Sequence, residues 1–472
     1  MSYSAPGVYI EDKVSGSRGI EQASSSVGIL FGVTASGVIN TPIKIGSWAE
    51  YIENFANGLK TPYLENSYLP YAVYGFFQNG GKELYVVSLK KNGVKASGTT
   101  TAGLVFTAKS EGAWGNNLKA TITKNADWVA GTNLSYDVKI ENLASGEKKT
   151  VTDCYLADIA DKFNSVAGDW CTVSTTGVLA LDEEDVTLTA GSDGTALTDG
   201  DYVNALDIMN TLDDVTLVAI PGQTSNVIND ALISYCDAHE LFPLLDMPMS
   251  ATVAETKSYR KTINAFTGAL LYPWGKTYDP LTDSLKSVPC AGHAMGVYAR
   301  VITKRGVWKS PAGTEAQVRG FVDMVSALTP TDISTLNPVG VVCVTAKTNF
   351  GIVLWGARSL NTSDSTMKYV SDGILNLNIK KSLYAGTQWA VFEPNDEFLW
   401  KSVSTSCRSF LETLRTQGAF KGSASEAYYV TCDSSNNTPA TIANGELNIE
   451  VGYAPVKPAE FVIIKLSHSI EA

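Results

Sequence analysis

Residue types that enzymes use occur in two glycine-containing stretches, but each stretch lacks an essential member of its pattern. Residues 80–83, Gly-Gly-Lys-Glu, are similar to the end of a phosphate-binding loop. That loop needs glycine where Phe76 stands and serine or threonine where Glu83 stands, so phosphate binding is not predicted here. Residues 292–296 have the glycine spacing of a nucleophile elbow, yet Ala294 occupies the central position and offers no nucleophilic atom.

The patterns of metal ligands and of reactive cysteines are equally incomplete. His239, His293 and His468 are far apart in the sequence, and none has the H-x-x-x-H spacing of a zinc-binding helix. The acidic stretch 182–185 and the Ser-Asp-Gly stretch 192–194 lack EF-hand spacing, so turns are a better interpretation than weak calcium binding. The seven cysteines form no C-x-x-C pair, which indicates reduced, mostly buried thiols, with disulfides as the alternative. We therefore predict no catalytic residue, no metal site and no cofactor.

A basic loop keeps one enzymatic interpretation open. Arg300, Arg305 and Arg319 flank Trp308, and the loop between Arg305 and Gly313 is rich in glycine and proline. Guanidinium groups beside an aromatic ring suit either a phosphorylated ligand or carboxylates across a protein interface. An α/β enzyme that binds a phosphorylated ligand near this loop is accordingly the alternative function.

The best-defined helix is predicted between residues 395 and 418. Asn395 or Asp396 can cap its start, Glu397 suits its first turn, and Gly418 lies past its end. The apolar residues of this segment share one helical face. They are Leu399, Val403, Cys407, Phe410 and Leu414.

Three basic residues of the same helix, Lys401, Arg408 and Arg415, recur at intervals of seven. At 3.6 residues per turn they form one stripe, roughly opposite the apolar face. A solvated face is the ordinary explanation of such a stripe. In a chain of net charge −12, it can also be a docking surface for an acidic partner.

Near the C-terminal end, residues 445–453 have the pattern of a half-buried strand. Leu447, Ile449 and Val451 alternate there with polar residues.

A second β-rich run, residues 461–466, is apolar on both faces and needs cover on both sides. Pro455 and Pro458 keep the link before it extended. Such a strand either folds back onto its own sheet or adds to the sheet of another subunit. General considerations alone favour the first outcome.

Alternation of strands and helices occupies two separate parts of the chain, and this pattern determines the predicted fold class. Residues 27–90 are expected to form a strand–helix–strand unit, and the alternation resumes after residue 200. The residues between are rich in Thr, Ser, Gly and Asp, with short alternating runs typical of strands. The predicted fold is α/β: a core with mixed or parallel sheets, an inserted β-rich module, and extended strand arms at both termini.

The expected domain boundaries follow these changes in pattern. They are 1–26 for an N-terminal arm, 27–90 for the first part of the core, 91–200 for the inserted module, 201–345 for an α/β region, 346–454 for a C-terminal α/β domain, and 455–472 for a C-terminal arm strand.

Composition and charge exclude several classes of function. Hydrophobic residues make up 44% and charged residues 18% of the 472 residues, as in soluble globular proteins. A net charge of −12 argues against nucleic-acid binding and against docking on an anionic membrane. No run is long enough to span a bilayer, and residues 1–6 lack the basic start and apolar core of a signal peptide. We therefore expect neither nucleic acid nor direct membrane insertion.

Several short stretches, spread over nearly the full length, occur in an order that is typical of one family. They are PGVYIE at 6–11, EGAWGNN at 111–117, AGSDG at 190–194, LVAIPG at 217–222, YPW at 272–274, GVYAR at 296–300, RGVWKSPAG at 305–313, LWGAR at 354–358, FEPN at 392–395 and PAEF at 458–461. In these stretches the chain resembles the contractile tail sheath proteins of bacteriophages and of phage-tail-like particles such as R-type bacteriocins. It departs from the family pattern at residues 301–303 and 371–373, so individual side-chain contacts there do not carry over.

The resemblance implies a structural subunit, without enzymatic activity or a cofactor. Such subunits form hexameric rings stacked helically around a tail tube, and the sheath contracts to drive the tube through the target cell envelope. The implied partners are further copies of the chain, the tube protein, and baseplate and terminator proteins. The chain would be made in the bacterial cytoplasm and become part of a virion tail or phage-tail-like particle.

The resemblance also gives roles to three sets of residues. Strand exchange between subunits would use Val8, Tyr9, Ile10, Phe461, Val462, Ile463, Ile464 and Leu466. The receiving sheet would contain Leu447, Ile449 and Val451, and Lys401, Arg408 and Arg415 are the candidates to face the tube.

Overall fold

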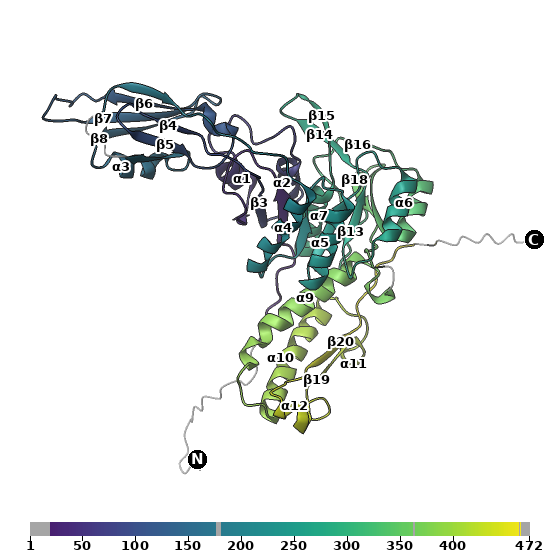
Figure 1. The fold of residues 1–472 in the computed structure, drawn as a ribbon. Helices are drawn as coiled ribbons and strands as arrows, with labels where there is room; N and C mark the ends of the chain where they lie inside the picture. Colours follow the sequence, from purple (N-terminus) through teal and green to yellow (C-terminus); the bar gives the residue numbers. More distant parts are fainter. Residues whose placement is uncertain (1–18, 176–180, 362–363, 462, 464–472) are drawn as a thin grey trace, which may run out of the picture. The chain divides into compact units, whose positions relative to one another are not determined.

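The computed structural model describes residues 19–175, 181–361, 364–461 and 463 (Figure 1). Contacts divide the chain into two units. The larger unit comprises residues 25–305 and 309–373, and the smaller unit holds residues 306–308 and the described residues before 25 and after 373. Helix α9 (Val370–Thr387) begins in the larger unit and continues in the smaller one.

The larger unit is built on an eight-stranded sheet. In spatial order its strands are β18 (Gly351–Trp355), β17 (Val341–Lys347), β13 (Ala269–Tyr272), β12 (Phe242–Asp246), β11 (Leu217–Ala219), β1 (Gly28–Gly32), β3 (Leu84–Ser88) and β2 (Ile43–Ile45). The strands from β17 to β3 run parallel, and the two edge strands run antiparallel to their neighbours. Strands β1, β12 and β13 are buried along their whole length, which explains their continuous apolar runs. The predicted α/β class with mixed and parallel sheets is confirmed.

Helices cover both faces of this sheet. They are α1 (Trp48–Phe55), α2 (Leu69–Gln78), α4 (Asp199–Ala205), α5 (Asn226–Ala238), α6 (Val253–Thr262), α7 (Ala291–Arg305) and α8 (Pro330–Leu336). On one face, Ile29 and Phe31 share a core cluster with residues of α4, α5 and α8. On the other face, Gly28 lies against Met295 of α7 and Gly32 against Leu69 of α2.

The glycines of residues 292–296 pack helix α7 against helix α2. A Cβ atom at Gly292 would lie 2.4 Å from the Cβ of Ala72, and one at Gly296 would lie 2.3 Å from the carbonyl oxygen of Phe76. Only glycine permits this close approach of the two backbones. The spacing that is similar to a nucleophile elbow therefore serves helix packing.

The inserted module leaves the sheet after β3 and returns before α4. One of its sheets has the order β10 (Glu184–Thr187), β6 (Leu118–Lys124), β7 (Tyr136–Asn142), β8 (Lys148–Cys154), and the other has the order β4 (Ser97–Thr99), β5 (Leu104–Ala108), β9 (Cys171–Thr175). Helix α3 (Ile159–Ala167) packs with both sheets around one buried core. A further three-stranded sheet of the larger unit contains β15 (Ser284–Val288), β14 (Gly275–Asp279) and β16 (Asp323–Met324).

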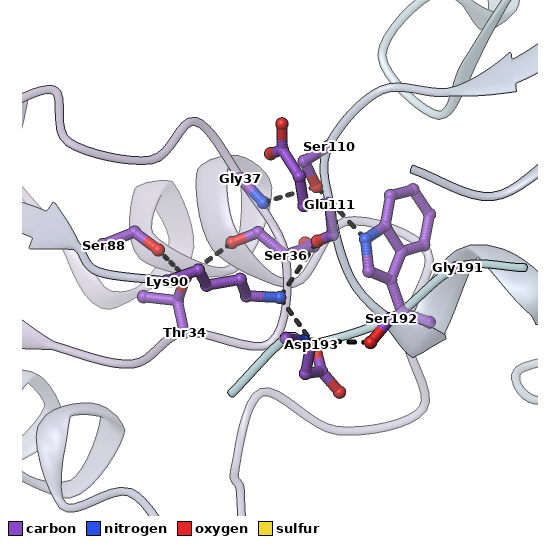
Figure 2. Close-up of polar contacts among 12 residues, drawn as sticks. Thr34, Ser36, Gly37, Ser88, Lys90, Ser110, Glu111, Gly191, Ser192 and Asp193 are labelled. Atoms are coloured by element: carbon purple, nitrogen blue, oxygen red, sulfur yellow. Dashed lines mark hydrogen bonds and ion pairs between the residues drawn. The ribbon is translucent and has the colours of Figure 1, made fainter. Parts of the chain in front are cut away.

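A buried lysine joins the module to the sheet (Figure 2). Lys90 follows β3, and its Nζ donates to the carbonyl oxygen of Glu111 at 2.9 Å and pairs with the carboxylate of Asp193 at 2.8 Å. Its side chain is only 1% exposed, so both partners are needed to offset the cost of burying the charge. Gly112 has φ +135°, and a Cβ there would lie 2.6 Å from Nζ. The EGAWGNN and AGSDG stretches thus meet at this joint.

Two of the expected domain boundaries fall inside regular elements. The boundary between residues 345 and 346 lies inside β17, because β18 continues the same sheet by pairing with β17. The chain instead passes from the larger to the smaller unit after residue 373. The boundary between residues 200 and 201 lies inside α4, which begins at Asp199. A change of composition reveals neither which strands pair nor that the capping box of Thr198 and Asp201 starts α4, and this is why these two boundaries are wrong.

The smaller unit contains the rest of α9, then α10 (Glu397–Thr416), α11 (Ala424–Ala427), β19 (Tyr428–Thr431), α12 (Pro439–Ala443) and β20 (Glu450–Tyr453), drawn in green to yellow in Figure 1. Helix α10 matches its prediction. The Asp396 carboxylate accepts from the N–H groups of Phe398 and Leu399 at 3.0 Å each. All five residues of the predicted apolar face are buried.

Candidate functional site

Groups with strongly shifted pKa values lie in the larger unit, where β12 ends and α7 begins. Asp246 accepts from the N–H groups of Cys290 and Ala291 at 3.0 Å each, and burial raises its pKa to about 7. The His293 ring lies 4.1 Å from the Phe321 ring between centroids, and burial lowers the pKa of His293 to about 3. Asp246, Cys290 and His293 are at most 3% exposed. Their positions in the core hold α7 in place and are closed to a substrate.

The basic loop finds partners within the larger unit. Arg305 pairs with the carboxylate of Glu315. Arg300 donates to the carbonyl oxygens of Asn79 at 2.8 Å and Gln317 at 2.6 Å, which ties the end of α2 to the loop. These contacts account for the two arginines and give no support to the phosphorylated-ligand alternative.

In residues 19–175, 181–361, 364–461 and 463, no three potential His, Cys, Asp or Glu ligands come together in a way that could hold a metal ion. In the same residues, no helix is both long and apolar enough to cross a membrane.

The smaller unit presents a two-stranded antiparallel sheet, and this sheet is the candidate site. Val430 of β19 is the register partner of Val451 of β20. Among the described residues, these two strands pair only with each other. A two-stranded ribbon is marginally stable by itself, and each of its strands has one side open to a further strand.

The alternation of hydrogen-bonded and non-hydrogen-bonded residue pairs along β19 and β20 shows which backbone groups point outward. The N–H of Ala454 donates to the carbonyl oxygen of Ala427 at 2.8 Å, which makes this a hydrogen-bonded pair. Bonded and non-bonded pairs alternate in an antiparallel ribbon, so the backbone groups of Val430 and Val451 point away from the partner strand.

Only part of the predicted receiving strand is a strand. Val451 lies in β20, whereas Leu447 and Ile449 precede it and belong to no strand, so that part of the prediction is wrong. Asparagine side chains take the backbone groups that a strand would use. Asn437 Oδ1 accepts from the backbone N–H of Asn448 at 2.6 Å. Asn436 Nδ2 donates to the backbone carbonyl oxygen of Asn448 at 3.0 Å. Side-chain hydrogen bonds of this kind compete with strand pairing.

A groove of about 380 Å³ lies beside β20 and α9. Most of its lining is apolar or aromatic. The lining residues are Asn376, Ile379, Lys380, Leu383, Tyr384, Thr387, Cys407, Ile449, Val451 and Tyr453. Two of the predicted receiving residues, Ile449 and Val451, therefore face this groove.

A polar hollow of about 510 Å³ lies beside β19 and α10. It is lined by Glu397, Trp400, Lys401, Ser404, Thr405, Arg408, Val430, Cys432, Asp433 and Ser434.

Two members of the basic stripe already have partners in the smaller unit. Arg408 Nη2 donates to the carbonyl oxygen of Val430 at 2.5 Å, and Arg415 pairs with both carboxylate oxygens of Glu412. Lys401 is exposed, and no ion pair of its amine is found among the described residues. The sequence spacing indicated the stripe but gave no signal that Arg408 reaches a strand.

The roots of both terminal arms are described. Residues 19–24 run along α9, where the amide of Gln22 donates to Asn378 at 3.0 Å and the N–H of Ala23 donates to Ser382 at 2.9 Å. At the other end, Phe461 is 72% and Ile463 is 79% exposed. The other residues predicted for strand exchange lie outside the described residues: Val8, Tyr9, Ile10, Val462, Ile464 and Leu466.

Comparison with solved structures defines the class of fold. The chain is similar to the sheath tail protein from Desulfitobacterium hafniense, with a TM-score of 0.66, 19% identity, and coverage of 90% of this chain and 94% of that one. It is also similar to the sheath of an extracellular contractile injection system in its contracted state, with a TM-score of 0.65, 21% identity, and coverage of 100% and 99%. The fold is therefore that of contractile sheath subunits.

Two family models match the sequence itself. The phage tail sheath protein central domain matches residues 195–360, and the phage tail sheath C-terminal domain matches residues 362–467, together more than half of the chain. The chain belongs to the phage tail sheath family.

Curated relatives agree with this assignment. A putative prophage major tail sheath protein of Pseudomonas aeruginosa is 24% identical over 251 residues, which are 52% of this chain and 62% of that protein. The tail sheath protein of Salmonella phage ViI is 26% identical over 175 residues, 37% of this chain and 27% of that protein. The chain thus covers less than two thirds of the length of these relatives.

Replacing Asp246 by Asn should flatten the pH dependence of stability between about pH 4 and pH 7. The folded carboxyl ionises near pH 7, whereas the unfolded chain ionises near its ordinary value of about 4. The folded protein then holds a proton that the unfolded chain has lost. Wild-type stability therefore falls as the pH rises through this window, by at most about 1.4 kcal/mol per pH unit.

Urea unfolding of both proteins at about pH 5 and about pH 7 measures this difference. Equal pH dependence of the wild type and the variant would contradict the proposed state of the Asp246 carboxyl.

Proposed function

We propose that this chain is the repeating subunit of a contractile tail sheath, which polymerises as stacked rings around a tail tube and drives it through a target cell envelope. One observation carries the proposal. The smaller unit holds a two-stranded sheet open to further strands, while the same chain extends an apolar run with Phe461 and Ile463 exposed. Exposed apolar residues beyond an open sheet are typical of a chain completed by its neighbours.

Strand addition explains how such a polymer forms and stays connected. An incoming strand gains main-chain hydrogen bonds at the sheet edge, and its alternate side chains enter the adjoining groove. Each subunit then donates a strand and receives one, because the run and the sheet belong to the same chain. Such links hold neighbouring subunits together while the units repack from an extended to a contracted state.

The proposal includes the tube, the baseplate and the tail terminator as partners, with no enzymatic activity and no cofactor. Lys401 remains the best candidate to face the tube, since Arg408 and Arg415 already contact groups of the same unit. An electrostatic grip is strong enough to position a tube and weak enough to release it. We place the chain in the tail of a phage or phage-like particle, after synthesis in the bacterial cytoplasm.

Ending the chain after Lys457 should abolish polymerisation and leave a folded monomer. The cut keeps the pairing between residues 419–421 and 454–456, so the sheet of the smaller unit stays complete. Replacing Phe461 and Ile463 together by Asp should act in the same way, because a carboxylate cannot be buried in an apolar groove without a large cost. Sedimentation and negative-stain microscopy measure the polymer.

Phe461→Leu is the matched control and should polymerise as the wild type does, since it keeps an apolar side chain. Normal polymers from the shortened chain would show that residues after 457 do not join subunits.

Lys401→Glu should leave the melting temperature unchanged but weaken association of the sheath with tail tubes. The side chain is exposed, so its replacement disturbs no buried contact. Co-sedimentation with purified tubes at low and high salt measures the effect, which should shrink as salt screens the charge.

Lys421→Glu, another exposed position of the smaller unit, is the control of equal charge change. Equal binding of tubes by the wild type and by both variants would exclude Lys401 from the tube interface.

A further inference from the structure

The two outer edges of the sheet in the smaller unit differ in chemistry. The edge of β20 adjoins the groove of about 380 Å³, whose lining is mostly apolar or aromatic and includes one charged side chain, that of Lys380. The edge of β19 adjoins the hollow of about 510 Å³, which contains the charged side chains of Lys401 and Asp433. An apolar strand gains from burial beside the first edge and loses by desolvating charges beside the second.

Arg408 also occupies the β19 edge directly. The carbonyl oxygen of Val430 points away from β20, where an added strand would donate to it. Arg408 Nη2 already donates to this oxygen at 2.5 Å, and its Nε donates to Ser404 Oγ at 3.2 Å, which fixes the guanidinium against the strand. A guanidinium has donors only. An incoming strand would therefore lose the Val430 carbonyl oxygen as an acceptor for its N–H group and would gain no acceptor from Arg408.

The residues beside the β20 edge fit the apolar C-terminal run. Val451 points its backbone groups outward on this edge, and its side chain lines the groove. A strand bound to Val451 would place alternate side chains over α9, where Leu383 and Tyr384 are at the surface of the groove. Residues 461–466 have apolar side chains on both faces of a strand, and Phe461 and Ile463 are exposed.

We propose that Arg408 closes the β19 edge and thereby directs residues 461–466 of a second copy to the β20 edge. This assignment rests on the strand exchange of the proposed function. Arg408 then selects the edge within its own unit, a different role from facing the tube. The role is that of a charged residue that protects a strand edge from unwanted pairing.

Hydrogen exchange of the full-length chain, followed by mass spectrometry before and after polymerisation, tests the proposal. In the polymer, the amide of Val451 should exchange at least about tenfold more slowly than in the monomer, as one added hydrogen bond predicts. The amides of Tyr428 and Val430 on β19 should exchange at unchanged rates. In Arg408→Met, protection should be divided between the two edges: the β19 amides gain protection and Val451 loses part of its own, because each subunit donates one strand and the β19 edge is then open.

Arg415→Met is the matched control, since Arg415 belongs to the same stripe but pairs with Glu412. It should keep the wild-type pattern.

The remaining outcomes overturn the proposal at distinguishable points. Protection of β19 in the wild-type polymer would refute the choice of edge and leave strand exchange intact. An unprotected β19 edge in Arg408→Met polymers would refute the role of Arg408. If wild-type polymers form without protection of either edge, or no polymer forms, strand exchange itself fails and the edge assignment fails with it. The wild-type comparison decides the choice of edge even if the Met variant does not fold.

Discussion

The backbone of an edge strand needs hydrogen-bond partners, and this need organises the smaller unit. Each strand of a two-stranded sheet has one side without a strand partner, so the chain either protects that side or offers it to another strand. Strand β19 has Arg408 on the carbonyl oxygen of Val430, whereas β20 has an apolar groove beside Val451. The same chain also carries a run whose Phe461 and Ile463 side chains are exposed. We propose that a sheath subunit of this design is completed by its neighbours.

The larger unit uses its polar groups for architecture. Lys90, buried between the carbonyl of Glu111 and the carboxylate of Asp193, fixes the inserted module where it leaves the sheet. Asp246 holds the first N–H groups of α7. Buried polar and charged groups that are paired or hydrogen-bonded define one arrangement of elements, since leaving them without partners is costly.

Sequence patterns within one segment predict individual helices and strands. Contacts between residues that are distant in the sequence determine the features that those patterns do not predict. Helix α10 could be predicted because its cap, Asp396, and its apolar face are set within one segment. The predicted receiving strand failed before residue 450, because Asn437 takes the backbone of Asn448, and no periodicity reveals such a bond. The interval of seven predicts that Arg408 shares a stripe with Lys401 and Arg415, but its contact with Val430 joins residues 22 positions apart and has no signal in that spacing. The sheath family can be recognised from the sequence because several short stretches occur in a distinctive order, although no single residue identifies the family.

We propose above all that subunits join by completing one another's sheets. A cryo-electron microscopy reconstruction of polymers of the full-length chain tests it most directly, because the path of every backbone can be traced between subunits. We expect residues 461–466 of one subunit to lie as a strand in the sheet of a neighbour, hydrogen-bonded beside Val451. Residues 461–466 folded onto the sheet of their own subunit, with neighbours in contact only through side chains, would contradict it.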